Sequence, residues 1–397
     1  MQCNHCGAIN HEEATFCVTC GQRLSPMGEV PQPGGISPGE QPAGVEPVTA
    51  QPVEQKRRKI PWLAIALGGL ALLCLAGASV AAYFIFRDTS STIAYVVNLS
   101  GEFDRGLYLM DADGENDRVL VSIDDNEDIG YFAWSPNGKS IAYSVMENSG
   151  MEYSLWVVEV ATGETRQIVG DIEGGRYCLF DWSPDSRQIV YTVNEEQLRI
   201  VNADGSEDTA LTDGIYPFWS PDGDSISFTH SSLEGASIIN PDGSALITLR
   251  EDPNRINVPW GWSPDNKWIL LHFEIGDGSM DLYLVSRDGQ EQIALVNNPD
   301  VSEQFPVFSP NGRWIAYISM DRDKDAGEIY IVRPDGSDAR RVATDAYEET
   351  FISWSPDSKA LVYVSNTDEA MRVELDSGEA SVLIEAAQRS DYPTYAP

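Results

Sequence analysis

Basic residues are scarce in this sequence. Its 397 residues contain 26 Lys and Arg against 62 Asp and Glu, which gives a formal net charge of −36. Residues 1–87 hold six acids and six bases, so residues 88–397 carry the whole negative charge. A field of this sign repels nucleic acid and attracts cations or basic partners. We therefore expect no nucleic-acid binding by the large C-terminal part.

Cysteine and histidine are also rare after residue 87. Only Cys178 of the six cysteines lies there, so this part cannot form an internal disulfide and its fold must depend on core burial. Only His230 and His272 of the four histidines lie there, and no general base of ordinary pKa is obvious. Catalysis has little support, and the sequence predicts a protein that is not an enzyme.

Charged residues are absent from 60–86, a stretch of 27 residues where about 20 suffice to cross a bilayer. The basic cluster 56–59 lies directly before it, so the positive-inside rule places the N-terminus in the cytoplasm and residues after 87 outside. The alternatives are a buried core helix or a cleaved signal peptide, which is normally shorter and begins near residue 1. We expect a single-pass protein of the cell membrane, and its oligomeric state stays open.

Four cysteines in the first 20 residues form two Cys-x-x-Cys pairs that are ten residues apart. Each pair suits a tight turn that aims two thiolates at one point, and two such turns complete a tetrahedral zinc site. So short a segment cannot build a core, so the metal must supply folding energy. The alternative is a redox pair or unpaired thiols. The expected ligands are Cys3, Cys6, Cys17 and Cys20.

Residues 1–24, with the pattern CxxCG…FCxxCGxxL, resemble the zinc-ribbon domain at the ends of many bacterial membrane proteins. The resemblance implies a structural, cytoplasmic ribbon with the same four cysteine ligands. Residues 25–59 follow as a Pro- and Gly-rich linker with a basic end. This composition cannot bury enough apolar surface to fold, so we expect a flexible, disordered tether.

A repeat organises the C-terminal part. The string Trp/Phe-Ser-Pro-Asp/Asn recurs six times, with its prolines at 136, 184, 221, 264, 310 and 356. The spacing of 37 to 48 residues suits a four-stranded propeller blade. Alternating apolar strands and Asp-Gly turns follow each string, a pattern typical of an all-β fold.

The first and last residues of the C-terminal part together make up one blade. Residues 93–95, 107–109 and 118–120 read as the second, third and fourth strands of a blade that lacks its first strand. The last residues, Tyr-Pro-Thr-Tyr-Ala-Pro at 392–397, match the first strand of the blade at 305–310. Joining the halves leaves no free sheet edge. The sequence thus predicts seven blades, one of them split.

Residues 90–397 resemble the TolB-like, WD-like propeller repeats that also occur in the propellers of prolyl oligopeptidase relatives. The resemblance implies a seven-bladed β-propeller that binds proteins or, in some members, gates an enzyme. Bacterial TolB has six such blades behind another domain, and no α/β-hydrolase domain follows here. Function should not be transferred from either by fold alone.

One face of this propeller should be strongly acidic, because the connections between blades are rich in Asp and Glu. We predict that it binds a basic protein segment or calcium ions, and the alternative is a solvated surface that keeps the domain soluble. The candidate residues are Asp124, Asp125, Asp128, Glu251, Asp252, Asp300, Glu303, Asp345, Glu348 and Glu349. Residues 111–117 also resemble part of a calcium loop but lack the distal Glu, so we expect a plain hairpin turn.

Three functions remain open from the sequence. The first is a non-enzymatic, membrane-anchored module that binds a protein or an envelope polymer outside the cytoplasm. The second is a hydrolase or lactonase that uses a metal held by carboxylates in the propeller channel. The third is a transmembrane sensor with output through the zinc ribbon.

Overall fold

The computed structural model describes residues 92–97, 105–147, 152–173, 179–194, 196–230, 235–251, 257–274, 280–296, 298, 301–321, 326–347, 351–384 and 391–397. The chain divides into two compact units, Met1–Arg87 and Asp88–Pro397. The predicted zinc ribbon, linker and membrane segment all lie outside the described residues. Within those residues, no helix is both long and apolar enough to cross a membrane.

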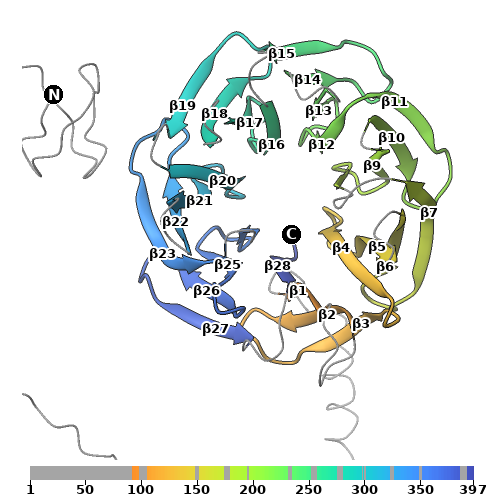
Figure 1. The fold of residues 1–397 in the computed structure, drawn as a ribbon, viewed down its shortest axis with the longest axis horizontal. Coiled ribbons are helices and arrows are strands. Elements are labelled where there is room, and N and C mark those ends of the chain that lie inside the picture. Colours follow the sequence, from red (N-terminus) through yellow and green to blue (C-terminus); the bar gives the residue numbers. More distant parts are fainter. Residues whose placement is uncertain are drawn as a thin grey trace, which may run out of the picture. The chain divides into compact units, whose positions relative to one another are not determined.

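The second unit is an all-β ring of seven four-stranded antiparallel sheets (Figure 1). From the inner to the outer strand, these sheets are β28 (Asp391–Tyr395), β1 (Thr92–Val97), β2 (Gly106–Asp111), β3 (Arg118–Ser122); β4 (Glu127–Trp134), β5 (Ser140–Glu147), β6 (Glu152–Glu159), β7 (Thr165–Glu173); β8 (Phe180–Trp182), β9 (Gln188–Val193), β10 (Gln197–Asn202), β11 (Thr209–Asp213); β12 (Ile215–Trp219), β13 (Ile226–Thr229), β14 (Gly235–Ile239), β15 (Ile247–Glu251); β16 (Asn257–Trp262), β17 (Trp268–Glu274), β18 (Met280–Ser286), β19 (Gln292–Val296); β20 (Val301–Phe308), β21 (Ile315–Asp321), β22 (Gly327–Val332), β23 (Arg340–Ala346); and β24 (Ser353–Trp354), β25 (Ala360–Val364), β26 (Ala370–Glu374), β27 (Ala380–Ile384). The prediction of seven blades is confirmed.

The split blade is also confirmed. Strand β28 pairs antiparallel with β1, with Ile93 opposite Tyr395 and Ala94 opposite Thr394. The backbone N–H of Ala396 donates to the carbonyl of Thr92 at 2.7 Å. The last strand of the chain therefore becomes the innermost strand of the first blade and closes the ring, which leaves no open edge there.

The repeated Ser-Pro turn joins the first strand of a blade to its second. In each of the six turns the serine Oγ donates to the Asp or Asn Oδ1 two residues later, at 2.6 to 3.0 Å. The proline fixes one backbone angle and the acidic or amide side chain closes the turn. Because the strand order is the same in every blade, all six turns lie on one side of the ring. We call this side the Ser-Pro face; it comprises 135–140, 183–188, 220–225, 263–268, 309–314 and 355–360.

The core lies between neighbouring sheets. The second strands are buried on both faces: every residue of β25 is buried, as is every residue of β1 after Thr92. The predicted period-2 alternation therefore fails in these strands. The physical reason is that each sheet is covered on both faces by its neighbours in the ring, so both sets of side chains must be apolar.

The tryptophan of the repeat links one blade to the preceding one. Its indole N–H donates to a backbone carbonyl in the preceding inner strand, from Trp134 to Thr394 at 3.4 Å and from Trp182 to Ala133 at 3.1 Å. Trp262 and Trp354 do the same at 3.1 Å, to Phe218 and Val307 respectively. The motif residue thus serves as an inter-blade contact as well as a core residue.

Replacing Trp182 by Phe should destabilise the fold by about 1 kcal/mol more than the same change at Trp219, because a phenyl ring keeps most of the packing but loses the indole donor. Both side chains are buried, at 3% and 7% exposure, but within the described residues the indole N–H of Trp219 has no hydrogen-bond partner. Urea unfolding of the two variants checks this. Equal losses would show that the inter-blade hydrogen bond contributes nothing.

Candidate binding site in the central channel

Irregular pairing in the inner strands shapes the central channel. The register between first and second strands shifts in five blades, near Gly130, Tyr216, Trp260, Phe305 and Pro393. A bulge of this kind redirects a side chain that would otherwise follow the regular alternation. Tyr216 and Phe305 adopt positive φ angles of 55° and 49°, a conformation that non-glycine residues seldom adopt.

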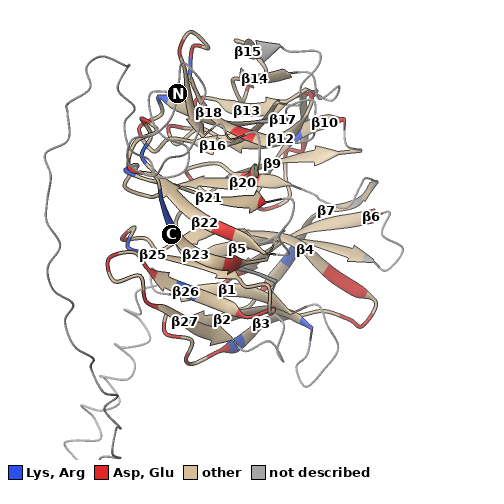
Figure 2. Cartoon of the chain, turned by 60° about the vertical axis from the view of Figure 1, so that its left-hand side comes forward, with Lys and Arg blue, Asp and Glu red and all other residues tan. Residues whose placement is uncertain are grey.

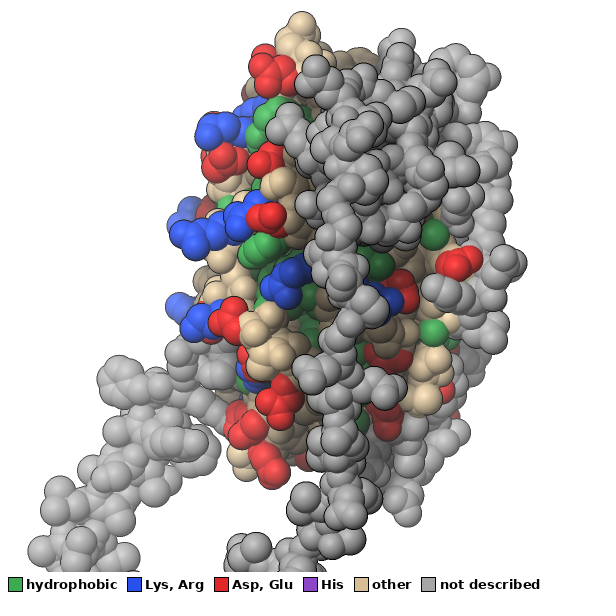
Figure 3. Space-filling view, turned by 90° about the vertical axis from the view of Figure 1, so that its left-hand side faces the viewer, with side chains coloured by type: hydrophobic (Ala, Val, Ile, Leu, Met, Phe, Trp, Pro, Cys, Tyr) green, Lys and Arg blue, Asp and Glu red, His purple; other side chains and the backbone are tan. Residues whose placement is uncertain are grey.

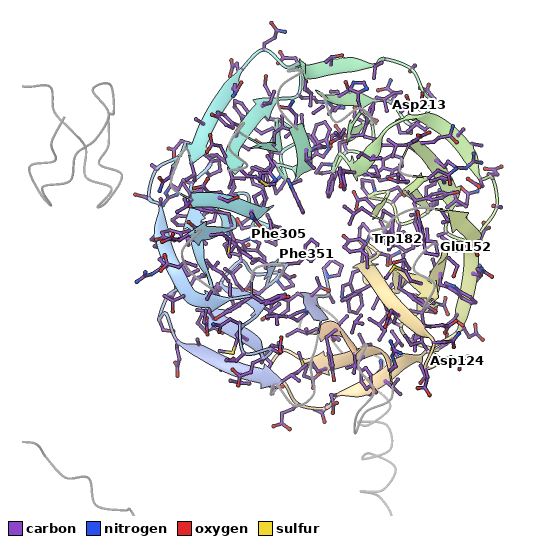
Figure 4. All side chains as sticks on the ribbon, in the orientation of Figure 1. Asp124, Glu152, Trp182, Asp213, Phe305 and Phe351 are labelled. Atoms are coloured by element: carbon purple, nitrogen blue, oxygen red, sulfur yellow. The ribbon has the colours of Figure 1, made fainter. Side chains whose placement is uncertain are left out.

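Four aromatic side chains meet inside the ring. The ring of Phe351 lies 5.2 Å from Phe305, 6.4 Å from Trp260 and 6.2 Å from Tyr131, measured between centroids. Trp260 and Phe305 are 5.4 Å apart with their planes at 80°, a favourable edge-to-face geometry. Figure 4 shows Phe305 and Phe351 on the inner side of the ring. Because these residues come from four different blades, they form an aromatic floor across the channel.

A cavity of about 800 Å³ lies against this floor. Its lining includes the prolines of four Ser-Pro turns and the equivalent C-terminal residue, which are Pro136, Pro221, Pro264, Pro310 and Pro397. The cavity therefore opens on the Ser-Pro face. The rest of the lining is mainly aromatic and aliphatic, with the hydroxyl groups of Ser309, Ser353 and Thr394. Such a surface binds by apolar burial and aromatic contact.

A half-buried carboxyl group, that of Asp181, lies beside the channel on β8. Asp181 accepts the backbone N–H of Trp182 at 2.9 Å and that of Trp219, in the next blade, at 2.7 Å. Burial raises the pKa of Asp181 to about 7, and this effect outweighs the two N–H donors, which lower it. Burial and the nearby Asp181 both raise the pKa of Tyr131, so this phenol stays neutral. With a pKa of about 7, Asp181 is about half ionised near neutral pH, so the charge beside the channel changes around that pH.

A second buried polar group lies between blades five and six. The indole N–H of Trp260 donates to His272 Nδ1 at 3.2 Å, and burial lowers the pKa of His272 to about 4. Glu303 is only 1% exposed, and burial, followed by the charge of Asp281, raises its pKa to about 9. In the described part of the chain, no three His, Cys, Asp or Glu side chains are grouped so that they could hold a metal ion.

Three of the predicted acidic residues come together where β3 connects to β4. Asp124 and Asp125 are exposed, and Asp128 forms an ion pair with Arg105. Arg105 also donates to the backbone carbonyl of Asp125 at 2.6 Å. Figure 2 shows that Asp and Glu outnumber Lys and Arg over the described strands and turns. Arg105 offsets part of the negative charge at this place.

The other predicted acidic residues have different outcomes. Glu303 is buried, so the prediction that it lies on an exposed face was wrong. Strand β20 directs its side chain into the interface between blades. The sequence alone shows only that an acidic residue lies near the start of a strand. Asp345 is half-buried and accepts the hydroxyl of Tyr363 at 2.8 Å. Glu251 ends β15. Outside the described residues lie Asp252, Asp300, Glu348, Glu349 and the four cysteines Cys3, Cys6, Cys17 and Cys20.

The acid-rich segment 111–117 is a hairpin turn, as expected. The N–H of Gly114 donates to the carbonyl of Asp111 at 2.9 Å, and the side chain of Asn116 donates to the carboxylate of Asp111 at 2.8 Å. The N–H of Glu115 donates to Asp113 at 3.2 Å. These acids therefore close the turn.

Sequence reasoning missed the channel residues. Tyr131, Phe305 and Phe351 each lie three residues before the Trp or Phe of the repeat, and Trp260 lies two before it. An aromatic residue at this place in several repeats was the available signal. The bulges that turn Tyr131, Trp260 and Phe305 inward leave no clear mark in the sequence.

The sequence matches a known family of β-propellers and is similar to two bacterial proteins. The sequence profile described as "TolB beta propeller domain" matches residues 86–242 and 244–397. The uncharacterized protein Atu1656 of Agrobacterium fabrum is 32% identical over 147 residues, which are 37% of this chain and 49% of that protein. The uncharacterized peptidase YuxL of Bacillus subtilis is 32% identical over 92 residues, 23% of this chain and 12% of that protein. The chain thus spans about half of the first relative and far less of the second.

Two solved structures share the architecture. An oligogalacturonate lyase in complex with manganese superposes with a TM-score of 0.55 at 11% identity, over 73% of this chain and 83% of that one. Prolyl oligopeptidase B from Galerina marginata, bound to a 35mer substrate, gives 0.54 at 14% identity, over 80% and 54% respectively. At these identities the likeness concerns the fold alone.

Proposed function

We propose a function for this chain, which belongs to the TolB β-propeller family. It is a membrane-anchored module that binds a protein segment at the mouth of its central channel. The propeller lies outside the cytoplasm, and the segment 60–86 anchors it. The cytoplasmic residues 1–24 form a zinc ribbon with a structural role. The module binds without catalysing a reaction.

The aromatic-floored cavity is the observation that carries this proposal. A volume of about 800 Å³ is in the range of sites that hold drug-sized ligands or a few side chains of a peptide. Its mouth is rimmed by prolines, and its floor consists of large, firmly packed aromatic side chains. Rigid aromatic groups in a concave site supply most of the affinity in many protein interfaces, because they bury apolar area at little cost in side-chain entropy.

The chemistry of the lining also favours binding over catalysis. Tyr131 is the one titratable side chain among the lining residues, and its raised pKa keeps it neutral. Proton transfer in catalysis requires a group whose pKa lies near the working pH and which reaches the substrate. Asp181 and Glu303 have shifted pKa values, but neither belongs to the lining.

A photo-crosslinking experiment tests the location of the site. The photoreactive residue p-benzoylphenylalanine replaces Phe351 in the channel, Asp124 on the acidic connection or Glu152 at the rim in full-length chains in intact cells (Figure 4). We expect a discrete protein adduct from position 351 and none from position 152. The adduct at 351 should fall at least about tenfold when Phe305 is also replaced by Asp, because a buried charge opposes an apolar ligand.

The same experiment can contradict the proposal. An adduct from position 124 but none from 351 would place the binding surface on the acidic face instead, where a basic segment is the expected partner. Adducts of the same identity and yield from all three positions would indicate non-specific proximity.

The buried polar group between blades five and six favours a second function, a metal-dependent hydrolase or lactonase. Within the described residues, the Oε2 atom of Glu303 and the Nε2 atom of His272 have no hydrogen-bond partner, a costly arrangement that a bound ion or water would relieve. Metal analysis of the purified full-length chain, with an esterase and lactonase screen in the presence and absence of a chelator, separates the two functions. Activity that chelation abolishes would favour the enzyme.

A further inference from the structure

We infer that Asp181 makes the channel site selective for a protein segment that carries a basic side chain next to its apolar residues. This inference rests on the proposed function and specifies the chemistry of the ligand. Three observations carry it: the place of Asp181 in a ring of inner-strand residues, its contact with the next blade, and the lack of a base on the described strands around it.

Asp181 occupies a position that recurs around the channel. In every blade one residue directly precedes the aromatic residue that ends the inner strand; these seven residues are Ala133, Asp181, Phe218, Gly261, Val307, Ser353 and Thr394. The last five of them line the cavity, as does Leu179, two residues before Asp181. Figure 4 shows the neighbouring Trp182 on the inner side of the ring. The half-buried carboxyl group of Asp181, the one ionisable member of the seven, therefore lies at the edge of the cavity.

The same carboxyl group joins the third blade to the fourth. One oxygen accepts the N–H of Trp219 at 2.7 Å, and the other accepts the N–H of Trp182 at 2.9 Å. Ser353 makes the equivalent contact between the seventh blade and the first, where its hydroxyl accepts the N–H of Tyr395 at 3.2 Å. A neutral hydroxyl can thus join two blades at this position. The contact between blades does not require the charge of Asp181.

No base compensates this charge on the strands that surround Asp181. Strand β8 packs against β4, β9 and β12, and none of these four strands, all of them described, contains Lys, Arg or His. Their other titratable side chains are Glu127, Asp128, Tyr131, Tyr191 and Tyr216. Asp181 raises the pKa of Tyr131, whereas Glu127 and Asp128 lie at the far end of β4. A half-buried carboxylate without a resident cation favours a ligand that brings one.

Bases of the propeller lie at its outer surface. Figure 3 shows Lys and Arg side chains on one outer side of the ring, with Asp and Glu among them. Arg187, in the Ser-Pro turn that follows β8, is 82% exposed and lies 3.9 Å from Asp185. In the described part of the chain, burial and two backbone N–H groups shift the pKa of Asp181, and no base contributes. The cation that this carboxylate lacks can therefore come from the bound segment.

The selectivity should depend on pH. Because the pKa of Asp181 is about 7, its carboxyl group is mostly neutral at about pH 5.5 and mostly ionised at about pH 8.5. Lys and Arg of a ligand stay positively charged throughout this range. The affinity for a basic segment should therefore rise with pH, whereas the affinity for an uncharged apolar segment should not.

Selection from a displayed library of random dodecapeptides tests the inference on the purified full-length chain in detergent. Peptides selected on wild type should carry Lys or Arg beside an aromatic or aliphatic residue. This preference for a base should be lost on Asp181→Asn and on Asp181→Ser, in which the serine can reproduce the contact that Ser353 makes. The matched control is Asp213→Asn, at the exposed end of β11 in the same blade (Figure 4), which should keep the preference. An equal preference on the Asp181 variants would overturn the inference, because the acidic surface would then be its source.

Binding of the strongest such peptide, acetylated and free of His, Asp and Glu, is then measured between about pH 5.5 and 8.5. The affinity of wild type should rise about tenfold across this range, with its midpoint near pH 7. Both Asp181 variants should show no such rise, and an analogue with norleucine in place of the base should bind all three chains independently of pH. Equal losses for both peptides at every pH would show that Asp181 only joins the blades, and would overturn the inference.

Failure of the proposed function gives a different result. Peptides that bind in the channel should lose their affinity for the Phe305→Asp variant, because a buried charge opposes apolar residues. If no selected peptide loses affinity for that variant, the channel is not a binding site, and both the proposed function and this inference are overturned. Peptides that bind in the channel without carrying a base would overturn this inference alone.

Discussion

Deletion of residues 391–397 is expected to abolish the cooperative unfolding transition of the propeller. This segment forms β28, the innermost strand of the first blade, and its removal leaves the inner edge of β1 unpaired. Buried apolar residues that remain in that blade, among them Ile93, Tyr95 and Val97, then lose the packing of Tyr395. We expect a loss of about 5 kcal/mol or more, which is comparable to the whole stability of many domains. Thermal and urea unfolding of the full-length chain in detergent measure it.

Addition in trans supplies the control for this deletion. A synthetic peptide with the sequence of residues 391–397 should restore part of the lost transition at high concentration, because it can add as a strand to the open edge of β1. A scrambled peptide of the same composition should have no effect. A truncated chain that melts like the intact one would contradict the closed-ring interpretation, since the closing strand would then carry no stability.

Replacement of Glu303 by Gln should make the stability of the propeller less dependent on pH. The pKa of Glu303 rises from 4.5 to about 9, so between these values the folded protein holds a proton that the unfolded chain has released. The stability that this site contributes is therefore fully present below about 4.5 and is lost as the pH rises toward about 9. Gln has a similar shape and does not titrate. Relative to wild type, the variant should become more stable by a few kcal/mol between pH 5 and pH 9.

Urea unfolding at a series of pH values measures this difference, with Glu152→Gln as the matched control at an exposed position on β6. The free energy of unfolding of the Glu152→Gln variant should change with pH in the same way as that of wild type. If the free energy of unfolding of Glu303→Gln also changed with pH as that of wild type does, Glu303 would be solvated or paired in the folded protein. His272 acts in the opposite direction, because its lowered pKa removes stability only as the pH falls from 6.5 toward about 4.

The architecture of the propeller could be predicted because its signals are local and repeated. Each Ser-Pro turn needs a serine, a proline and an Asp or Asn at fixed spacing, and the same hydrogen bond recurs in all six turns. The split blade was predictable for the same reason, since the residues around Tyr395 match a first strand and those around Ile93 match a second. A single copy of the turn pattern would be weak evidence for a blade, but its recurrence at regular spacing makes the prediction of the fold strong.

The candidate site was not predictable in the same way. The acidic residues stood out by composition, but burial of Glu303 and pairing of Asp128 with Arg105 depend on which strand lies opposite them. The channel aromatics look like ordinary strand residues. Their convergence requires bulges in the inner strands and the meeting of four blades that are far apart in the chain.

By itself, the sequence determined the number of blades, their turns and the closure of the ring by the C-terminal strand, because turn chemistry and periodicity act over a few residues. Only the tertiary structure decided which side chains face the channel and which carboxyl groups are buried. Those properties arise from ring closure, which brings Tyr131, Trp260, Phe305 and Phe351 within contact of one another across more than 200 residues of chain.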